Sequence, residues 1–227
     1  MKAQNRAARN LILLLIAAIL AAGEILPAQT RPTTPLELLK QGNEYSKAKN
    51  WKDAVLAFRK ALELKPDYVE AHYNLAGVYG TTQNIPDAIH EYKEVLRLSP
   101  DFPGVHKNLG ALYESQGQLM EAIAEYRMLV GSHPNEAESH AVLANALTSA
   151  RQFPEAAVEY HRALQLKPRD AEIHAALANS YQIDGDSAGA MKEFHQALEL
   201  EPKIRTSTQA WPPRSPRGAT WRVRSGN

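Results

Sequence analysis

The chain of 227 residues contains no cysteine. This absence excludes disulfide bonds and thiolate metal sites, and it removes the acceptor cysteine that a bacterial lipoprotein needs for its lipid. It does not assign a redox compartment, because a cysteine-free chain is compatible with any of them.

Signatures of catalysis are also absent from the sequence. It has no His-Glu-x-x-His zinc motif, no glycine loop for a phosphate and no serine elbow. Carboxylate pairs at helical spacing do occur, at Glu91–Glu94, Glu121–Glu125 and Glu155–Glu159. Such pairs are far more often a solvated helix face than an acid/base dyad. We therefore predict that the protein is not an enzyme and uses no cofactor.

Acidic residues are missing from both ends of the chain. Residues 1–23 hold three basic residues and residues 203–227 hold six, whereas all 25 acidic residues lie between 24 and 202. That central region keeps 17 of the 26 basic residues, so it is acidic by 8 charges. A surface of this sign disfavours nucleic acid as a partner.

The first 23 residues have the pattern of an export signal. A basic start precedes an apolar run of twelve residues, 11–22, which covers about 18 Å as a helix, short of the ~30 Å bilayer core. Small residues follow, so cleavage after Gly23 is expected, with Ala28 as a second candidate. The alternative is an uncleaved inner-membrane anchor over 11–26, which alone would give membrane contact. In both cases the residues after this segment are predicted to be periplasmic or secreted. They begin with a linker at 24–34.

A fixed period dominates the remaining sequence. It is carried by five equally spaced prolines, namely Pro66, Pro100, Pro134, Pro168 and Pro202. An alanine stands twelve residues before each proline and an aromatic residue eight before it. A small residue recurs at Gly42, Ala76, Gly110, Ala144 and Ala178. A fixed period of this length is typical of stacked helical hairpins.

This pattern resembles the tetratricopeptide repeat, a helix-turn-helix unit of about 34 residues. The resemblance covers 35–204 as five units, at 35–68, 69–102, 103–136, 137–170 and 171–204. It implies an all-α fold, a right-handed solenoid of five antiparallel hairpins with a concave groove lined by the first helix of each unit. In the second unit we expect helices from Glu70 to Thr82 and from Pro86 onward, and Pro103 is expected to begin the third unit. The segment 205–227, rich in Pro, Arg and Trp, is predicted to be a disordered basic tail.

Several residues are expected to shape helix ends and turns. Gly117 and Gly185 are predicted to end helices in the left-handed conformation, with Asn50 and Asn84 doing so less well. Asp67, Asp101 and Asn135 follow the recurrent proline and can cap the next helix.

Histidine occupies one register in four units, at His72, His106, His140 and His174. Equivalent positions on stacked helices lie about 8–10 Å apart, too far to share one metal ion, so we interpret these rings as packing groups and predict no metal site. Burial as neutral imidazole would make the fold mildly sensitive to acid. His161 and His195 lie on second helices and are expected at the solvated surface.

Asparagines recur on the predicted first helices, where a side-chain amide offers a donor and an acceptor to a peptide backbone. This ladder looks like that of the repeat domain of O-linked N-acetylglucosamine transferases, without their catalytic domain. The carboxylate clamp of chaperone-binding relatives is matched only by Asn43 and Asn74, whereas Leu39, Gly104 and Asn108 replace its basic residues. The groove candidates are Asn43, Tyr73, Asn74, Lys107, Asn108, Asn145 and Asn179.

These observations predict an exported, non-catalytic interaction scaffold that binds an extended peptide or helix of a partner protein in its groove. The alternative is a structural subunit that self-assembles or docks on a membrane-associated machine through an open C-terminal face, because a solenoid needs polar elements to cover its last apolar surface. A homodimer would cover that face.

Overall fold

The computed structural model describes residues 34–202 as ten helices with no strand among them. The chain divides into two compact units, one up to Pro100 and one from Asp101 onward. The signal or anchor at 1–23, the linker up to 33 and the basic tail lie outside the described residues. Over residues 34–202, no helix is long and apolar enough to cross a membrane.

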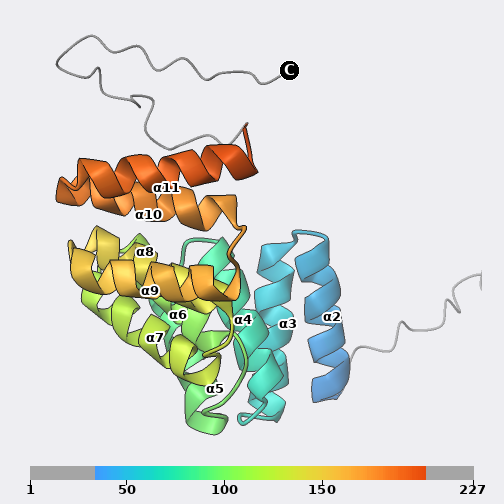
Figure 1. Cartoon of the computed structure of the whole chain (residues 1–227). Coiled ribbons are helices and arrows are strands. Elements are labelled where there is room, and N and C mark those ends of the chain that lie inside the picture. The colour runs from blue at the N-terminus through green and yellow to red at the C-terminus, as the bar shows by residue number, and fades with distance from the viewer. Residues whose placement is uncertain (1–33, 203–227) are drawn as a thin grey trace, which may run out of the picture. The chain divides into compact units, whose positions relative to one another are not determined.

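The first unit consists of two hairpins (Figure 1). Its helices are α2 (Pro35–Lys47), α3 (Trp51–Leu64), α4 (Val69–Thr81) and α5 (Ile85–Leu98). Each helix packs on the next, and α2 also contacts α4, so the two first helices lie side by side.

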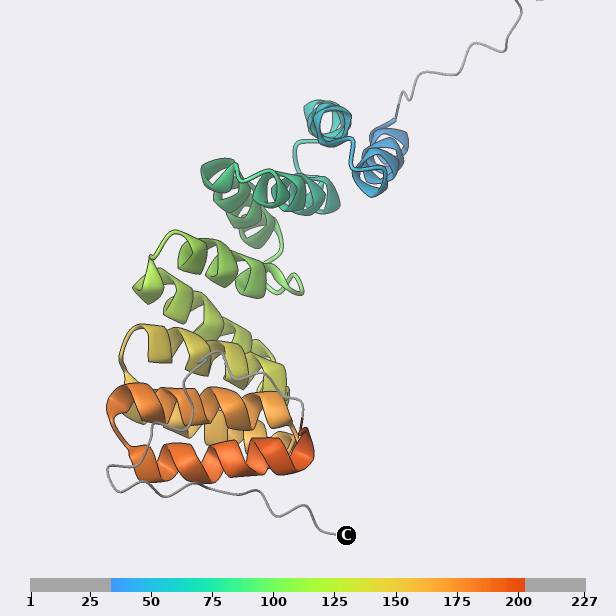
Figure 2. The ribbon, with the colours of Figure 1, turned by 90° about the horizontal axis from the view of Figure 1, so that it is seen from above.

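The second unit consists of three hairpins, which Figure 2 shows stacked on one another. Its helices are α6 (Val105–Ser115), α7 (Leu119–Ser132), α8 (Ala137–Ser149), α9 (Phe153–Leu166), α10 (Ala171–Asp184) and α11 (Ser187–Leu200). Consecutive helices pack together from α6 to α11, and α8 contacts α10. The all-α repeat fold is therefore confirmed, with one helix pair in each predicted repeat. The right-handed superhelix and a single groove along five repeats stay predictions.

Small residues bring the two helices of a hairpin together, as the period predicted. The recurrent alanine of the second helices is fully buried in every hairpin, from Ala54 to Ala190. A Cβ added at Gly42 would overlap the ring of Phe58, and one at Gly110 would overlap the ring of Tyr126. The aromatic side chain thus occupies the space that glycine leaves on the first helix.

The turn between the helices of each hairpin has one residue in the left-handed conformation, again at the repeat period. Gly117 and Gly185 hold it as predicted, with φ of 73° and 94°. In the other three turns the residue is Lys49, Gln83 or Arg151. The expectation for Asn50 and Asn84 was therefore wrong by one position. Both asparagines are instead the N-cap residues of α3 and α5, and each donates a side-chain hydrogen bond to an aspartate three residues on.

Helix bounds differ from the expectations in several places. Helix α4 runs from Val69 to Thr81, so each of its ends lies one residue before the expected Glu70 and Thr82. Helix α5 begins at Ile85, one residue before Pro86, and α6 begins at Val105 after the left-handed Gly104, so Pro103 does not start it. The predicted caps Asp67, Asp101 and Asn135 are not N-cap residues. The side-chain caps are formed by residues nearer the helices, which are Thr34 on α2, Asp170 on α10 and Asp186 on α11.

Candidate functional site

An open groove of about 830 Å³ lies on the first unit, between the first helices of its two hairpins. Its lining includes three of the predicted residues, Asn43 on α2 and Tyr73 and Asn74 on α4. Trp51 of α3 and Tyr92 of α5 also contribute. The structure therefore brings these three candidates into one concave site.

The two asparagines connect the helices that form the groove. The amide Nδ2 of Asn74 donates a hydrogen bond of 2.8 Å to Oδ1 of Asn43. An amide side chain carries two donor hydrogens and an acceptor oxygen, so this bond leaves further capacity on both residues. The Nδ2 of Asn43 and the Oδ1 of Asn74 provide a donor and an acceptor at the groove, the pair of groups that a peptide backbone presents in return.

Aromatic side chains form a second part of the groove. The rings of Tyr73 and Tyr92 meet edge to face, with centroids 5.6 Å apart at 66°. Tyr92 is buried while Tyr73 is half-buried, so Tyr73 offers ring surface to a ligand. Gly77 adds no side chain to the lining, and a Cβ there would only touch the Tyr92 hydroxyl at 3.8 Å. The groove can therefore accept backbone close to α4.

Lysines surround the polar part of this groove. Lys40 and Lys47 lie on α2 and are exposed, and both line the groove. Lys47 makes a 2.7 Å ion pair with Glu44, a pair with both side chains at least 70% exposed. A pair so exposed contributes little to stability, so these charges can rearrange around a ligand.

The remaining candidates belong to the second unit and have different environments. Lys107 of α6 pairs with Glu138 of α8, and this contact lowers the pKa of the Glu138 carboxyl. Asn108 of α6 and Asn179 of α10 are half-buried, whereas Asn145 of α8 is exposed. Oδ1 of Asn145 accepts a 2.6 Å hydrogen bond from the Tyr160 hydroxyl, so its oxygen already has a partner within the fold.

The four histidines that share one register do more than fill space, because each makes a polar contact. In every repeat from the second to the fifth, Nδ1 of the histidine contacts a glutamate on the second helix of the same hairpin, always at the same distance along the chain. The pairs are His72–Glu91 at 2.5 Å, His106–Glu125 at 2.7 Å, His140–Glu159 at 2.6 Å and His174–Glu193 at 2.7 Å. In the first repeat the equivalent positions hold two buried apolar residues, Leu38 and Ala57.

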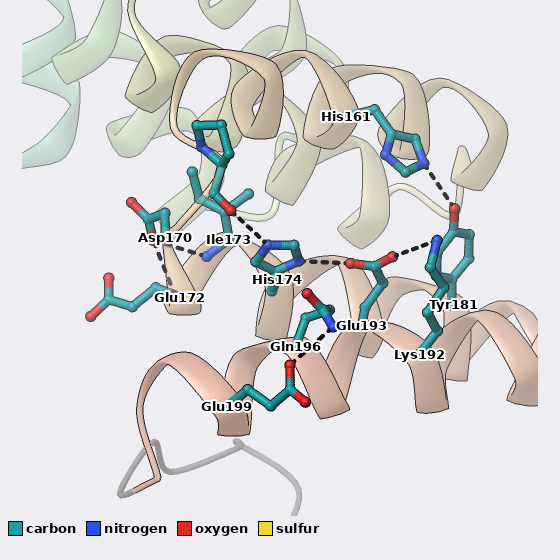
Figure 3. Close-up of polar contacts among 11 residues, drawn as sticks. His161, Asp170, Glu172, Ile173, His174, Tyr181, Lys192, Glu193, Gln196 and Glu199 are labelled. Atoms are coloured by element: carbon teal, nitrogen blue, oxygen red, sulfur yellow. Dashed lines mark hydrogen bonds and ion pairs between the residues drawn. The ribbon is translucent and has the colours of Figure 1, made fainter.

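A third group joins most of these pairs. Nε2 of His72, His140 and His174 lies 2.9, 3.0 and 3.3 Å from the carbonyl oxygen of the recurrent proline six residues earlier. Nδ1 of His174 faces the Glu193 carboxylate (Figure 3), while its Nε2 faces the Pro168 carbonyl. The ring thus ties the first helix of a hairpin to the second helix and to the preceding turn. No group of three potential ligands in residues 34–202 is arranged to hold a metal ion.

The glutamates of these pairs correct the prediction of a solvated face. Glu91, Glu125 and Glu159 are half-buried against their histidines, and Glu193 is only 5% exposed. Their predicted companions differ, since Glu121 and Glu155 are exposed and Glu94 pairs with Arg97. The constant spacing of His and Glu in four repeats was a signal in the sequence that the helix-face argument did not use. His161 and His195 are exposed, as expected.

The surroundings of His72 favour a charged ring, where a neutral one is expected from the sequence. The hydrogen bond to Glu91 raises the pKa of the His72 imidazole, burial opposes this, and the Pro66 carbonyl adds to the rise. With acceptors facing both ring nitrogens, the doubly protonated imidazolium is the form that satisfies both contacts. Acid is therefore expected to stabilise the contacts of His72, whereas a buried neutral imidazole would make acid weaken the fold.

Stacked hairpins with a shared interior and an open groove on their first helices define a class of protein, the helical repeat proteins. Profiles of the tetratricopeptide repeat match most of the repeat region. One described as TPR repeat matches residues 42–83, 82–117 and 144–185, and two described as Tetratricopeptide repeat match 108–136 and 171–204. The chain belongs to the tetratricopeptide repeat family.

Solved structures share this fold at low sequence identity. A MamA protein is 21% identical with a TM-score of 0.69, covering 74% of this chain and 92% of that one. YrrB, described as a TPR protein with an unusual peptide-binding site, is 18% identical with a TM-score of 0.67, covering 74% and 87%. MamA from Desulfovibrio magneticus RS-1 is 17% identical with a TM-score of 0.69, covering 74% and 95%. No curated protein sequence matches the chain.

Proposed function

We propose that this protein is a non-catalytic interaction scaffold outside the cytoplasm, and that it binds an extended segment of a partner protein along its first helices. The observation that carries the proposal is the groove of the first unit, where Asn43 and Asn74 present amide groups beside the Tyr73 ring. Family membership supports the scaffold role. The peptide-binding site named for YrrB belongs to that protein, and it supports peptide binding here as a precedent in the same fold.

The chemistry of the groove favours recognition of backbone over side chains. Asn43 and Asn74 offer one donor and one acceptor, and Gly77 lets a peptide approach α4 closely. Tyr73 adds a flat apolar surface with few rotatable bonds, which lowers the entropy cost of ordering the interface. We therefore expect an extended ligand with modest sequence preference and with affinity that depends on the amides.

Site-directed photo-crosslinking tests the groove. A photoreactive amino acid at Thr81, which is exposed and lines the groove, should crosslink to the partner in the native envelope. The same amino acid at Arg59, exposed on α3 outside the groove lining, is the matched control. Replacing Asn43 and Asn74 together by alanine should weaken crosslinking at Thr81 at least tenfold, since each lost interface hydrogen bond contributes about 1 kcal/mol.

The control positions decide the interpretation. Equal crosslinking at Thr81 and Arg59, or crosslinking at Thr81 that survives the double alanine replacement, would count against groove binding. Circular dichroism of the Asn43 and Asn74 variant should match that of the parent protein, because both side chains lie at the groove surface and neither belongs to the buried core.

A further inference from the structure

Helix α11 carries two apolar side chains on one face that are only partly covered within residues 34–202. Met191 is 46% exposed and Leu198 is 41% exposed. They stand seven residues apart, which places them two turns apart on the same side of the helix.

The repeat period shows what normally covers this face. In the fourth repeat the equivalent residues, Ala157 and Leu164, are half-buried on α9, and α10 packs on that helix. In the third repeat Ile123 is only 1% exposed on α7, and α8 packs there. Met191 and Leu198 are therefore the contacts that the first helix of a following repeat would bury.

The segment directly after α11 holds a residue in the matching register. Trp211 stands one repeat period after Leu177, in the column that holds Leu109 and Leu143, and these three leucines are at most 3% exposed. Pro212 and Pro213 come next and prevent an α-helix from running on through this point. The segment thus has an apolar residue at the position of the buried leucine of a first helix, but the prolines that follow do not allow such a helix to continue.

The length of the segment allows this contact. Trp211 is the ninth residue after Pro202, and a chain of this length spans up to about 30 Å when extended. The distance along α11 from Leu198 back to Met191 is only about 10 Å. Trp211 can therefore reach the exposed face of the same chain.

Charge favours the same contact. Residues 171–202 hold six acidic residues and one basic residue, whereas residues 203–227 hold six basic residues and no acidic one. The acidic side chains that are exposed around the hairpin are Glu172, Asp184, Asp186, Glu199 and Glu201. Opposite charges attract at the surface when they come within the screening distance of about 8–10 Å, so docking of the segment on the hairpin would bring the two sets into range.

We propose that residues 203–227 dock on the outer face of α11, with Trp211 covering Met191 and Leu198, and so cap the repeat array. A solenoid needs such a cap because its last repeat otherwise leaves apolar surface in water. The basic residues of the segment hold it against the acidic last hairpin, and the tryptophan ring supplies the apolar contact.

Tryptophan fluorescence of the full chain tests the docking. A variant with Trp51→Phe and Trp221→Phe leaves Trp211 as the single tryptophan. Its emission should be blue-shifted, and acrylamide should quench it several-fold less than free tryptophan. Adding Met191→Lys and Leu198→Lys should remove both effects, because the two lysines repel the basic segment and replace the apolar side chains on which Trp211 would pack. Val158→Lys is the matched control, since Val158 is 65% exposed on α9, and it should change neither.

Thermal unfolding gives a second measure that does not depend on the phenylalanine replacements. Trp211→Ala in the otherwise native chain should lower Tm by about 2–4 °C. The same change should have no further effect when Met191→Lys and Leu198→Lys are already present, because two changes that remove one contact are not additive.

Two results would overturn the proposal. Quenching of Trp211 that equals that of free tryptophan in the parent variant would show that the segment does not dock. Protection of Trp211 from acrylamide that disappears on dilution, together with a dimer in sedimentation, would show that a second copy of the chain covers the α11 face.

Discussion

His72 connects its own repeat with the end of the preceding one, because its ring contacts the carboxylate of Glu91 on α5 and the carbonyl of Pro66 before α4. The sequence alone predicts that the four histidines are packing groups, because equivalent positions on stacked helices lie too far apart to share one metal ion. It does not reveal their partners, because the pattern on one helix face does not show which residues of two packed helices meet. The constant spacing from histidine to glutamate becomes meaningful only once the hairpin is formed.

The contacts of His72 predict stability that falls as the pH rises. Its pKa is raised by the hydrogen bond to Glu91, with smaller contributions from the Pro66 carbonyl and the charge of Glu94, while burial opposes the rise. A raised folded-state pKa stabilises the fold fully below the unfolded value of about 6.5, and that stabilisation is lost as the pH passes through the folded-state pKa. Lowering the pH toward 6 should therefore strengthen this contact.

Urea unfolding of the parent protein and His72→Asn between pH 5.5 and 9 measures this effect. The parent should be more stable by about 2 kcal/mol near pH 6, the size of a hydrogen bond to a charged group, and the difference should shrink toward pH 9. The other histidines are present in both proteins and cancel in the comparison. A difference that is constant over the range would show that His72 does not titrate in this contact.

The first repeat suggests how the His–Glu pair can be replaced. It has Leu38 and Ala57 at the two equivalent positions, both buried. In the fourth repeat, His140→Leu alone leaves the half-buried Glu159 carboxylate without its partner and should cost about 2–3 kcal/mol of unfolding free energy. Adding Glu159→Ala should recover most of that loss. Denaturant unfolding of both single variants and the double variant checks this, and equal losses in His140→Leu and the double variant would contradict it.

The presence of each helix could be predicted from the sequence more reliably than the residues at which it begins and ends. Buried alanines and aromatic residues recur in fixed columns, and those columns set which face of each helix is inside. The ends depend on local hydrogen bonds, so α5 begins one residue before Pro86 and α6 begins after Gly104. The left-handed turn residue was predictable only where it is glycine. At Lys49, Gln83 and Arg151 the packing of the hairpin imposes a conformation that these residues do not favour.

Two helical glycines of the third repeat offer a matched test of helix packing. Gly110→Ala places a methyl group against the Tyr126 ring, which is 3% exposed and packed in the core, so the helices must separate. We expect a loss of about 1–3 kcal/mol of unfolding free energy. Gly131→Ala adds the same methyl group to α7 with no atom within 4 Å, and should stabilise the protein by up to about 1 kcal/mol through helix propensity.

Chemical denaturation of these two variants separates packing from propensity. Opposite signs are expected, although the chemical change is the same. A Gly110→Ala protein as stable as the parent would mean that α6 and α7 do not depend on close approach at this position.

At the scale of the molecule, the repeat period predicted five hairpins because every copy carries the same buried columns. The groove of the first unit was predicted in part, since Asn43, Tyr73 and Asn74 line it while Trp51 and Tyr92 come from second helices that the sequence argument did not place there. In the second unit, the hydroxyl of Tyr160 engages Asn145, a contact between the two helices of one hairpin. Side-chain partners across a hairpin are set by rotamers and packing, which a pattern of residue types does not determine.

Export of the whole molecule is a proposal that rests on residues 1–23 and can be tested on the mature protein. If the basic start and the apolar run at 11–22 act as a signal, mass spectrometry of protein recovered from the periplasm should find an N-terminus at Glu24, or at Gln29 if cleavage follows Ala28. Leu13→Arg with Leu14→Arg should block processing, because each arginine at the centre of an apolar segment costs about 2.5–3.5 kcal/mol on insertion. Asn10→Lys, which adds charge outside the apolar run, is the control and should be processed normally. Full-length protein in the membrane fraction would favour the anchor over 11–26, and full-length protein in the cytosol would exclude export.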